Sequence, residues 1–278
     1  MSDLFGLQSE TINAASKLAH VTVEFESELV LDEVSLRFPA NECTVIMGGT
    51  GSGKSTLLKC AAGLVVPNRG QVTILGIDAA RSTDREIEGL GRKVGFVFQD
   101  GALWQNMSLQ QNLEFPLRFH QPGLSESEIR DRIDRLVGEA QATRRLTLRP
   151  AQVSAGERKI ISFLRALVNG PGLLFLDEPT ASVDSERIDL MIRMLREVKL
   201  RGATIVAVTH NPKVVSQLAD HIVIQRHGRL LAADTLQRIS RSNDPQIERV
   251  LTDVLSESAT YDGDILDLLE PDTNPFLT

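Results

Sequence analysis

The chain is poor in cysteine and in aromatic residues, and it contains no long apolar run. Of its 278 residues, two are cysteines (Cys43 and Cys60) and 4% are aromatic. Two cysteines supply neither a disulfide framework nor a four-ligand zinc site, which favours a reducing compartment. No stretch approaches the ~18 uncharged apolar residues that a membrane-spanning helix needs. The N-terminus also lacks the basic and apolar segments of a secretory signal, so we expect a cytosolic protein.

An excess of positive charge is also missing. The chain has 37 acidic against 30 basic residues, and this argues against a dedicated nucleic-acid-binding protein. The surplus of acid lies in one place, because seven acidic residues and no Lys or Arg follow Val250. The rest of the chain is balanced, with 30 residues of each sign. We therefore expect 241–278 to be an acidic C-terminal extension of a neutral body.

Short apolar runs alternate with helical periods along most of the body. Strands are expected at 20–25, 29–38, 44–47, 72–75, 94–98, 173–176 and 204–208, and a helix rich in Ile, Met and Leu is expected at 185–199. Continuous apolar strands that alternate with helices predict a buried parallel sheet covered on both faces. Residues 100–168 differ, because they show only helical periods, at 108–115, 125–140 and 157–168. This pattern predicts that residues 100–168 are a helical insertion into an α/β core.

A glycine cluster follows the apolar run 44–47 and precedes a helical period. Residues 48–55 match the pattern G-x-x-x-x-G-K-[ST] in the strand–helix context that a phosphate-binding loop requires. Its backbone N–H groups and the helix N-terminus attract phosphates, Lys54 reaches the β- and γ-phosphates, and Ser55 can ligate Mg²⁺. A dinucleotide-binding pattern fails, because Lys54 stands directly after the last glycine. The candidate nucleotide-binding residues are Gly48, Gly49, Thr50, Gly51, Ser52, Gly53, Lys54, Ser55 and Thr56.

Two acidic residues stand at the end of the buried strand 173–176. In open α/β sheets, ligands bind at the carboxyl ends of strands, so Asp177 can face a Mg²⁺ at the phosphate loop. Glu178 is then the candidate general base for hydrolysis of a nucleoside triphosphate.

Further segments resemble, in order over roughly residues 20–230, the nucleotide-binding domain of ABC transporters. Residues 153–157 are similar to the family signature Leu-Ser-Gly-Gly-Gln, with Ala155 in place of a glycine and Glu157 in place of the glutamine. Residues 181–184 stand where the family has a loop that contacts the second subunit. The resemblance is therefore carried by several motifs beyond the phosphate loop.

This resemblance assigns roles to five other positions. Phe25 stands where an aromatic ring stacks on adenine, and Gln99 where a glutamine contacts Mg²⁺. Ser154 and Gly156, in the signature, would approach a γ-phosphate. His210 matches a histidine that contacts the γ-phosphate.

The resemblance also implies a fold and an assembly. It implies a P-loop NTPase core with an antiparallel β subdomain, expected at 1–99 and 167–240, and an inserted α-helical subdomain at 100–166. It implies ATP and Mg²⁺ as cofactors. It further implies a homodimer in which the signature of each copy covers the phosphate loop of the other, so that ATP closes the pair and hydrolysis releases it.

Two segments at the start of the helical block resemble a narrower family. Residues 98–104 and 112–118 are similar to ATPases of bacterial lipid-asymmetry (Mce-associated phospholipid) transport systems, as are 243–246. This implies a membrane permease docked around 100–118, with Leu103 and Trp104 in the contact, on the cytoplasmic face of the inner membrane. Mce-type substrate-binding and small regulatory subunits would be further partners, and nucleic acid would not.

Two other readings stay open for the assembly. The chain could be the ATPase of a lipoprotein-releasing or other ABC transporter. It could also be a regulatory ATPase that signals through a membrane partner, as in cell division.

Two aliphatic stripes run through the acidic extension. The first has helical spacing from Ile247 to Leu255, and the second, 265–269, ends shortly before Pro271. Because a solvated tail would not need such stripes, we expect the extension to bind either its own core or the neighbouring copy.

Overall fold

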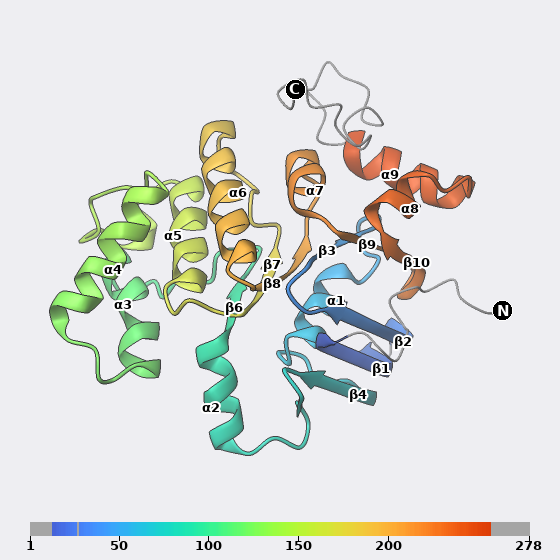
Figure 1. Ribbon diagram of the computed structural model, residues 1–278, viewed down its shortest axis with the longest axis horizontal. Helices are drawn as coiled ribbons and strands as arrows, with labels where there is room; N and C mark the ends of the chain where they lie inside the picture. Colours follow the sequence, from blue (N-terminus) through green and yellow to red (C-terminus); the bar gives the residue numbers. More distant parts are fainter. Residues whose placement is uncertain (1–12, 27, 257–278) are drawn as a thin grey trace.

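The computed structural model describes residues 13–26 and 28–256 (Figure 1). The second aliphatic stripe of the acidic extension, and the docking predicted for it, lie outside the described residues.

Within the described residues, six strands form the central sheet, in the order β10-β9-β3-β8-β7-β6. They are β3 (Cys43–Met47), β6 (Val94–Val97), β7 (Leu173–Asp177), β8 (Thr204–Val208), β9 (His221–Arg226) and β10 (Arg229–Thr235). All neighbouring pairs are parallel except β9 and β10, which form an antiparallel hairpin. The buried parallel sheet predicted from the apolar runs is therefore present.

The strands are apolar throughout because both faces of the sheet are covered. In β7, Leu174 and Leu176 pack toward the helical side, whereas Leu173 and Phe175 pack toward the opposite side. Alternate side chains of a strand point to opposite faces, so a continuous apolar run is what two covered faces require.

A smaller antiparallel sheet lies on one side of the central sheet, with helix α1 (Lys54–Ala61) packed against both. Its strands are β1 (Ala14–Phe25), β2 (Glu28–Pro39), β4 (Arg69–Ile74) and β5 (Ile77–Asp78), in the order β2-β1-β4-β5. The expected strands at 20–25, 29–38 and 72–75 are thus parts of this sheet. It corresponds to the antiparallel β subdomain that the family resemblance implies.

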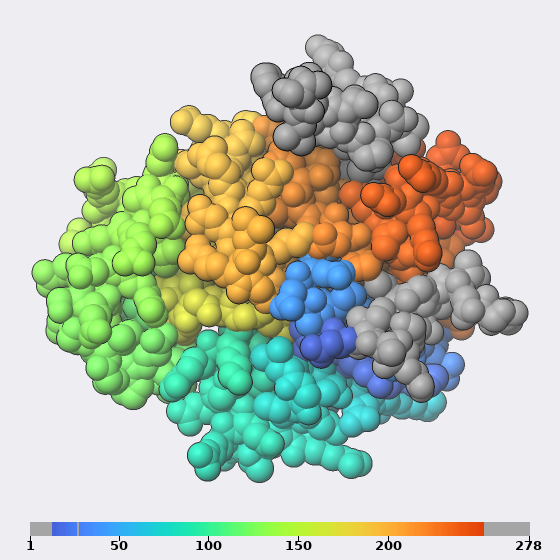
Figure 2. All heavy atoms as spheres, viewed as in Figure 1, coloured from blue at the N-terminus to red at the C-terminus, as the bar shows by residue number. Residues whose placement is uncertain are grey.

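The block 100–168 is helical, as its periodicity predicts. It contains α3 (Leu109–His120), α4 (Glu126–Glu139), a 3₁₀ turn η2 (Pro150–Gln152) and α5 (Ala155–Leu167), and no strand. Helices α3 and α4 begin at Ser108 and Ser125, whose hydroxyls accept from the third residue of each helix in capping boxes. In Figures 1 and 2 these helices, in green, form one side of the molecule.

The remaining helices lie around this core. They are α2 (Asp84–Lys93), α6 (Ser185–Leu200), α7 (Pro212–Leu218), α8 (Leu236–Ser240) and α9 (Pro245–Ser256). The sequence patterns had predicted α6 and α9 but not α2, α7, α8 or the strands β5, β9 and β10. In α9, Ile247 and Leu251 are buried in the main core cluster, so the first half of this aliphatic stripe packs on the chain's own core. No helix in residues 13–26 and 28–256 is both long and apolar enough to span a membrane.

Candidate active site at the carboxyl edge of the sheet

The phosphate loop connects the end of β3 to the start of α1. Two of its glycines have no room for a side chain, and both have positive φ. A Cβ on Gly48 would lie 2.1 Å from the carbonyl oxygen of Gln225, and one on Gly53 would lie 2.8 Å from that of Val30. The glycines of the motif therefore let the loop curl close to β9 and β2.

Lys54 is folded into this loop. Its Nζ donates to the carbonyl oxygens of Gly48 (2.8 Å) and Gly49 (2.9 Å), and the residue is only 9% exposed. The ammonium group is therefore already inside the loop, where the phosphate oxygens of a nucleotide can compete for it.

Ser55 and Asp177 meet although 122 positions separate them. The Ser55 hydroxyl donates to Asp177 Oδ1 at 2.9 Å, and Asp177 is 1% exposed. The strand register explains the meeting, because Ile46 and Asp177 are both paired with Val208 of β8, which lies between them. Two hard oxygen donors at the phosphate loop suit Mg²⁺, which takes few protein ligands beside water and phosphate. The residues present therefore fit the metal predicted from the sequence.

Glu178 follows directly and lies beside His210. Its Oε1 is 3.2 Å from His210 Nε2, and its backbone N–H donates to the carbonyl oxygen of Val208 at 2.9 Å. Burial, with a smaller contribution from the charge of the neighbouring Asp177, raises the pKa of Glu178 to about 7. A backbone hydrogen bond from His210 and the charges of Lys54 and Lys159 act in the opposite direction. A carboxyl group poised near neutral pH is suited to general-base work.

Gln99 and Phe25 lie at the ends of other strands. Gln99 follows β6, the neighbour of β7, and its side chain is exposed at the same edge of the sheet as Asp177. Phe25 ends β1 with its ring 49% exposed, which leaves a face open for stacking. Both positions are compatible with the roles predicted for them, and these roles stay predictions.

The signature segment forms the start of α5. Ser154 is the N-cap, and its hydroxyl accepts from the Glu157 N–H at 3.1 Å. Gly156 lies against the loop 181–184, since a Cβ there would be 2.7 Å from the Ser182 carbonyl oxygen. Glu157, which departs from the family pattern, forms an ion pair of 2.7 Å with Arg187 at the start of α6. The signature and the loop 181–184 of one chain are therefore in direct contact.

Sequence reasoning missed two cations on α5. Lys159 is 5% exposed, and its Nζ donates to the carbonyl oxygens of Phe98 (3.1 Å) and Gln99. Arg165 donates to the carbonyl oxygens of Gly101 (3.0 Å) and Ala102 (2.8 Å). A detectable signal was available for the first, because Lys159 precedes an unbroken buried run of α5, residues 160–164.

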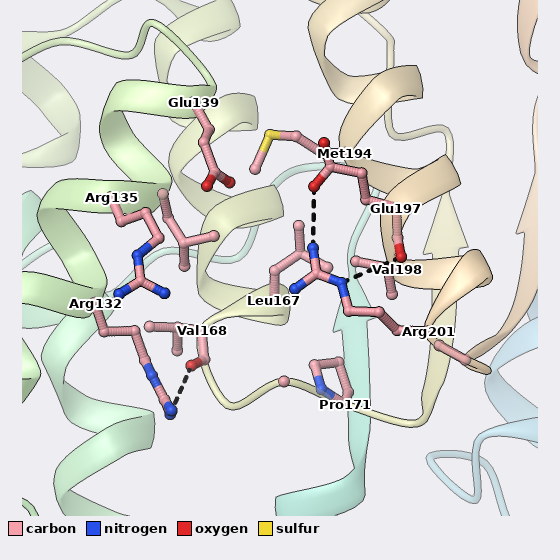
Figure 3. Close-up of a pocket in the computed structure, with 13 residues that line it drawn as sticks. Arg132, Arg135, Glu139, Leu167, Val168, Pro171, Met194, Glu197, Val198 and Arg201 are labelled. Atoms are coloured by element: carbon pink, nitrogen blue, oxygen red, sulfur yellow. Dashed lines mark hydrogen bonds and ion pairs between the residues drawn. The ribbon is translucent and has the colours of Figure 1, made fainter.

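The structure has two cavities of about 240 Å³ each, one at the phosphate loop and one at a distance from it. One lies beside the phosphate loop, between Gly49–Ser52 and the basic side chains of Arg226, His227 and Arg249. The other lies between α4 and α6, where Arg132 and Arg135 face Arg201 across an apolar floor (Figure 3). The predicted phosphate-loop residues 49–52 line the first cavity, whereas none of the predicted site residues lines the second.

Comparison with known proteins agrees with this geometry. The family model described as ABC transporter matches residues 31–181. The methionine import ATP-binding protein MetN of Geobacillus kaustophilus is 30% identical over 239 residues, which are 85% of this chain and 69% of that protein. The sulfate/thiosulfate import ATP-binding protein CysA of Xanthomonas campestris pv. campestris is 36% identical over 227 residues, 80% of this chain and 64% of that protein. The Probable ribonucleotide transport ATP-binding protein mkl of Mycobacterium leprae is 32% identical over 244 residues, 86% of this chain and 69% of that protein.

Solved structures are similar over most of the described fold. The dimeric, post-hydrolysis structure of the ATP-binding cassette MJ0796, bound to ADP and Pi, superposes with a TM-score of 0.74 at 31% identity. The match covers 79% of this chain and 98% of that one. The chain therefore belongs to the ABC transporter family and is an ATP-binding domain with ATPase activity, for which ATP and Mg²⁺ are the cofactors.

Proposed function

We propose that this ATPase works as a pair of identical chains that closes on two ATP molecules and drives a separate membrane permease, which moves phospholipid between bacterial membranes. The observation that carries the proposal is the convergence of Ser55, Asp177, Glu178 and His210 at one sheet edge, with the signature Ser154 on another element.

In this proposal each residue at the edge has one task. Lys54 and the loop N–H groups bind the phosphates, while Ser55 and Asp177, with Gln99, hold Mg²⁺, which neutralises phosphate charge. Glu178 takes the proton of the attacking water, and His210, whose Nε2 lies 3.2 Å from Glu178 Oε1, keeps that water oriented and contacts the γ-phosphate. Phe25 offers its exposed ring to the adenine.

The pairing of two chains is supported by the shape of the signature. Ser154 is exposed at the N-terminus of α5. A helix N-terminus with free N–H groups binds phosphate well, and a second copy can supply that phosphate. The similar cassette MJ0796 is dimeric in its solved structures.

Mixed dimers test this pairing. Gly156→Asp adds a Cβ where Ser182 leaves no room and a negative charge beside the partner's γ-phosphate. Mixed with Lys54→Ala chains, it should leave at most one intact site in each heterodimer, with ATPase activity reduced accordingly. Each homodimer should be inactive, so a heterodimer that is no more active than the two homodimers would rule out the shared arrangement.

An aromatic surface at the start of the helical block supports the contact with a permease. Trp104 (40% exposed), Phe115 (40%) and Phe119 (58%) form a row with ring centroids 4.8 and 6.0 Å apart. Contiguous exposed apolar side chains typically mark a contact surface. Leu103 does not belong to it, because the side chain is 7% exposed and packs in the main core cluster. The contact predicted for Leu103 was therefore wrong, and Phe115 and Phe119 extend the surface around Trp104 instead.

Charged substitutions test this surface. Trp104→Glu with Phe119→Glu should release the protein from membranes of the source cell while ATP binding persists. Leu200→Glu is the matched control, because Leu200 is 87% exposed at the far end of α6. Continued membrane association of the double variant would move the docking surface elsewhere.

Phospholipid as the cargo is supported by the sequence of this same region, 98–104 and 112–118. The named relatives are linked by their names to methionine, sulfate or ribonucleotides, so the family alone does not select the cargo. Isolation of the complex through a tag on this chain, followed by lipid extraction, tests the assignment. Enriched phospholipid together with Mce-type and small regulatory subunits is the expected result, and a complex devoid of lipid would contradict it.

A further inference from the structure

Two cationic side chains of helix α5 donate hydrogen bonds to the backbone of the loop after β6. Lys159 donates to the backbone carbonyl oxygens of Phe98 and Gln99, and Arg165 donates to those of Gly101 and Ala102. Four of the five carbonyl groups in residues 98–102 therefore accept hydrogen bonds from a single helix.

Burial makes Lys159 an unusual choice for this position. Taking an ammonium group out of water is costly unless it is hydrogen-bonded and faces opposite charge. Burial lowers the pKa of Lys159, and the charges of Asp177, Asp100 and Glu178 oppose that effect. The cation therefore lies near the catalytic carboxylates, where an apolar side chain would pack at lower cost.

The partners of Lys159 are main-chain atoms, and this has a consequence for Gln99. Its carbonyl oxygen is held from α5, while its side chain stays exposed at the edge of the sheet. A shift of the Gln99 backbone that accompanies the movement of its side chain toward Mg²⁺ and nucleotide would therefore act directly on the Lys159 ammonium group.

The same helix reaches two other places. It begins at Ser154 of the signature, and Arg165 near its end lies over the Trp104 ring at 5.1 Å from the centroid. The Trp104 backbone is fixed in turn by buried Asn112, which accepts from the Trp104 N–H (2.8 Å) and donates to its carbonyl oxygen (3.1 Å). A 13-residue helix is stiff, so its two ends move together.

We propose that Lys159 is a positioning residue that transmits the state of the Gln99 loop to helix α5, and through Arg165 to Trp104 on the aromatic surface. The inference rests on the proposed function, in which Gln99 responds to bound Mg²⁺ and ATP. Lys159 thereby links nucleotide binding in one chain to the signature and to the permease contact of that chain.

The sole tryptophan of the chain provides a direct readout. Mg²⁺-ATP is titrated onto the Glu178→Gln protein, which binds without rapid turnover, and Trp104 fluorescence and calorimetric binding are followed together. The expected result is a fluorescence change that saturates with binding. In Glu178→Gln with Lys159→Met, binding should persist and the fluorescence change should be lost, whereas Lys159→Arg should retain it.

Turnover with Glu178 intact supplies a second readout. Lys159→Met should lower kcat by roughly 2- to 30-fold, the range for one residue in a coupling network, with little change in KM for ATP. Lys199→Met is the matched control, because Lys199 also donates to a backbone carbonyl, that of Leu218 (3.1 Å), but at the opposite edge of the sheet. It should leave both kcat and the fluorescence change as in the wild type.

The outcomes separate this inference from the proposed function. Absence of Mg²⁺-ATP binding in the parent protein would defeat the proposed function itself. Binding without any Trp104 response, or a full response in Lys159→Met, would overturn the inference alone. If Lys159→Met does not fold, Lys159→Gln replaces it, with the same loss expected because the shorter amide is uncharged. If neither folds, Lys159 is a stability residue and the inference falls.

Discussion

The phosphate-loop edge and the start of α5 both carry candidate nucleotide contacts, but the chain positions them in different ways. At the edge, Asp177 and the phosphate loop follow directly from buried strands whose register is set by backbone hydrogen bonds along β8. At the start of α5, position depends on a few side chains, chiefly Glu157 with Arg187 and Lys159 with the carbonyl oxygens of residues 98 and 99.

This difference suits the two tasks. Groups that do chemistry need fixed geometry, and a ladder of many backbone hydrogen bonds in a dry sheet provides it. A segment that responds to a ligand needs two arrangements of similar free energy, and a handful of polar contacts can be exchanged. We therefore expect substitutions at the edge to abolish chemistry and substitutions around α5 to weaken its coupling.

The largest effect is expected at the edge. Glu178→Gln removes the candidate general base but keeps the shape of the side chain, so kcat should fall by at least ~100-fold while ATP binding remains. Steady-state ATPase assays and calorimetry measure the two quantities. Glu139→Gln, at the exposed end of α4, is the control and should turn over normally. Unchanged turnover in Glu178→Gln would show that Glu178 is not the general base. The contrast between a chemical edge and a coupling helix would then fail.

A smaller effect is expected at the ion pair between the signature and α6. Glu157→Arg alone places two cations where the 2.7 Å ion pair stands, in a half-buried site, and Arg187→Glu alone places two acids there. Each should lower ATPase activity several-fold, and the charge-swapped double variant should recover most of it. The coupling energy in this cycle should be about 0.5–3 kcal/mol, as for residues in contact.

Failure of the double variant to recover would also be informative. Glu157 accepts the Thr143 N–H at 3.2 Å in addition, which the swapped arginine cannot do. If the swap restores thermal stability but not activity, charge is not what positions the signature, and the contrast with the strand-held edge weakens.

The same difference explains what sequence reasoning could predict. Asp177 was predicted because a strand of four apolar residues ends at it, and parallel strands end at a common edge. Lys159 and Arg187 were not predicted. Lys159 binds backbone carbonyl oxygens of a distant loop and Arg187 binds the Glu157 side chain, and no local sequence pattern indicates either contact. Leu103 was placed in the permease contact because residues 98–104 resemble a transporter family, whereas the chain turns at Ala102 (φ 43°) and buries Leu103.

Helix α2 and strand β9 show a second limit. The apolar run of strand β9 is only three residues long, 222–224, although its residues 221–225 are all buried. Helix α2 has no fully buried residue, and its apolar stripe consists of only two side chains, Ile87 and Leu90, which is too short to be recognised as a helix by pattern. Its start is marked only by the capping box of Thr83 and Glu86, a local signal that needs no core.

The smallest expected effect is on the stability of the folded chain in the absence of ATP and Mg²⁺, which the buried Glu178 carboxyl lowers as the pH rises. Burial raises the pKa of Glu178 to about 7 from its ordinary value of 4.5. A raised carboxyl pKa means that the unfolded chain loses this proton first. The folded state is therefore progressively penalised as the pH rises from about 4.5 to about 7, and the penalty stays constant above that.

Glu178→Gln cannot lose a proton, so it should gain stability over the wild type as the pH rises through this window. Each pH unit between the two pKa values contributes about 1.4 kcal/mol, so the gain between pH 5 and pH 8 should be on the order of 1–3 kcal/mol, or a few degrees in Tm. Thermal unfolding of both proteins at the two pH values measures it. Glu178→Asp keeps an ionisable group in the same buried place and should follow the wild type. If the stability difference between Glu178→Gln and the wild type is the same at pH 5 and pH 8, then Glu178 has the same pKa in the folded and unfolded states. The sheet edge would then not disfavour the charged carboxylate.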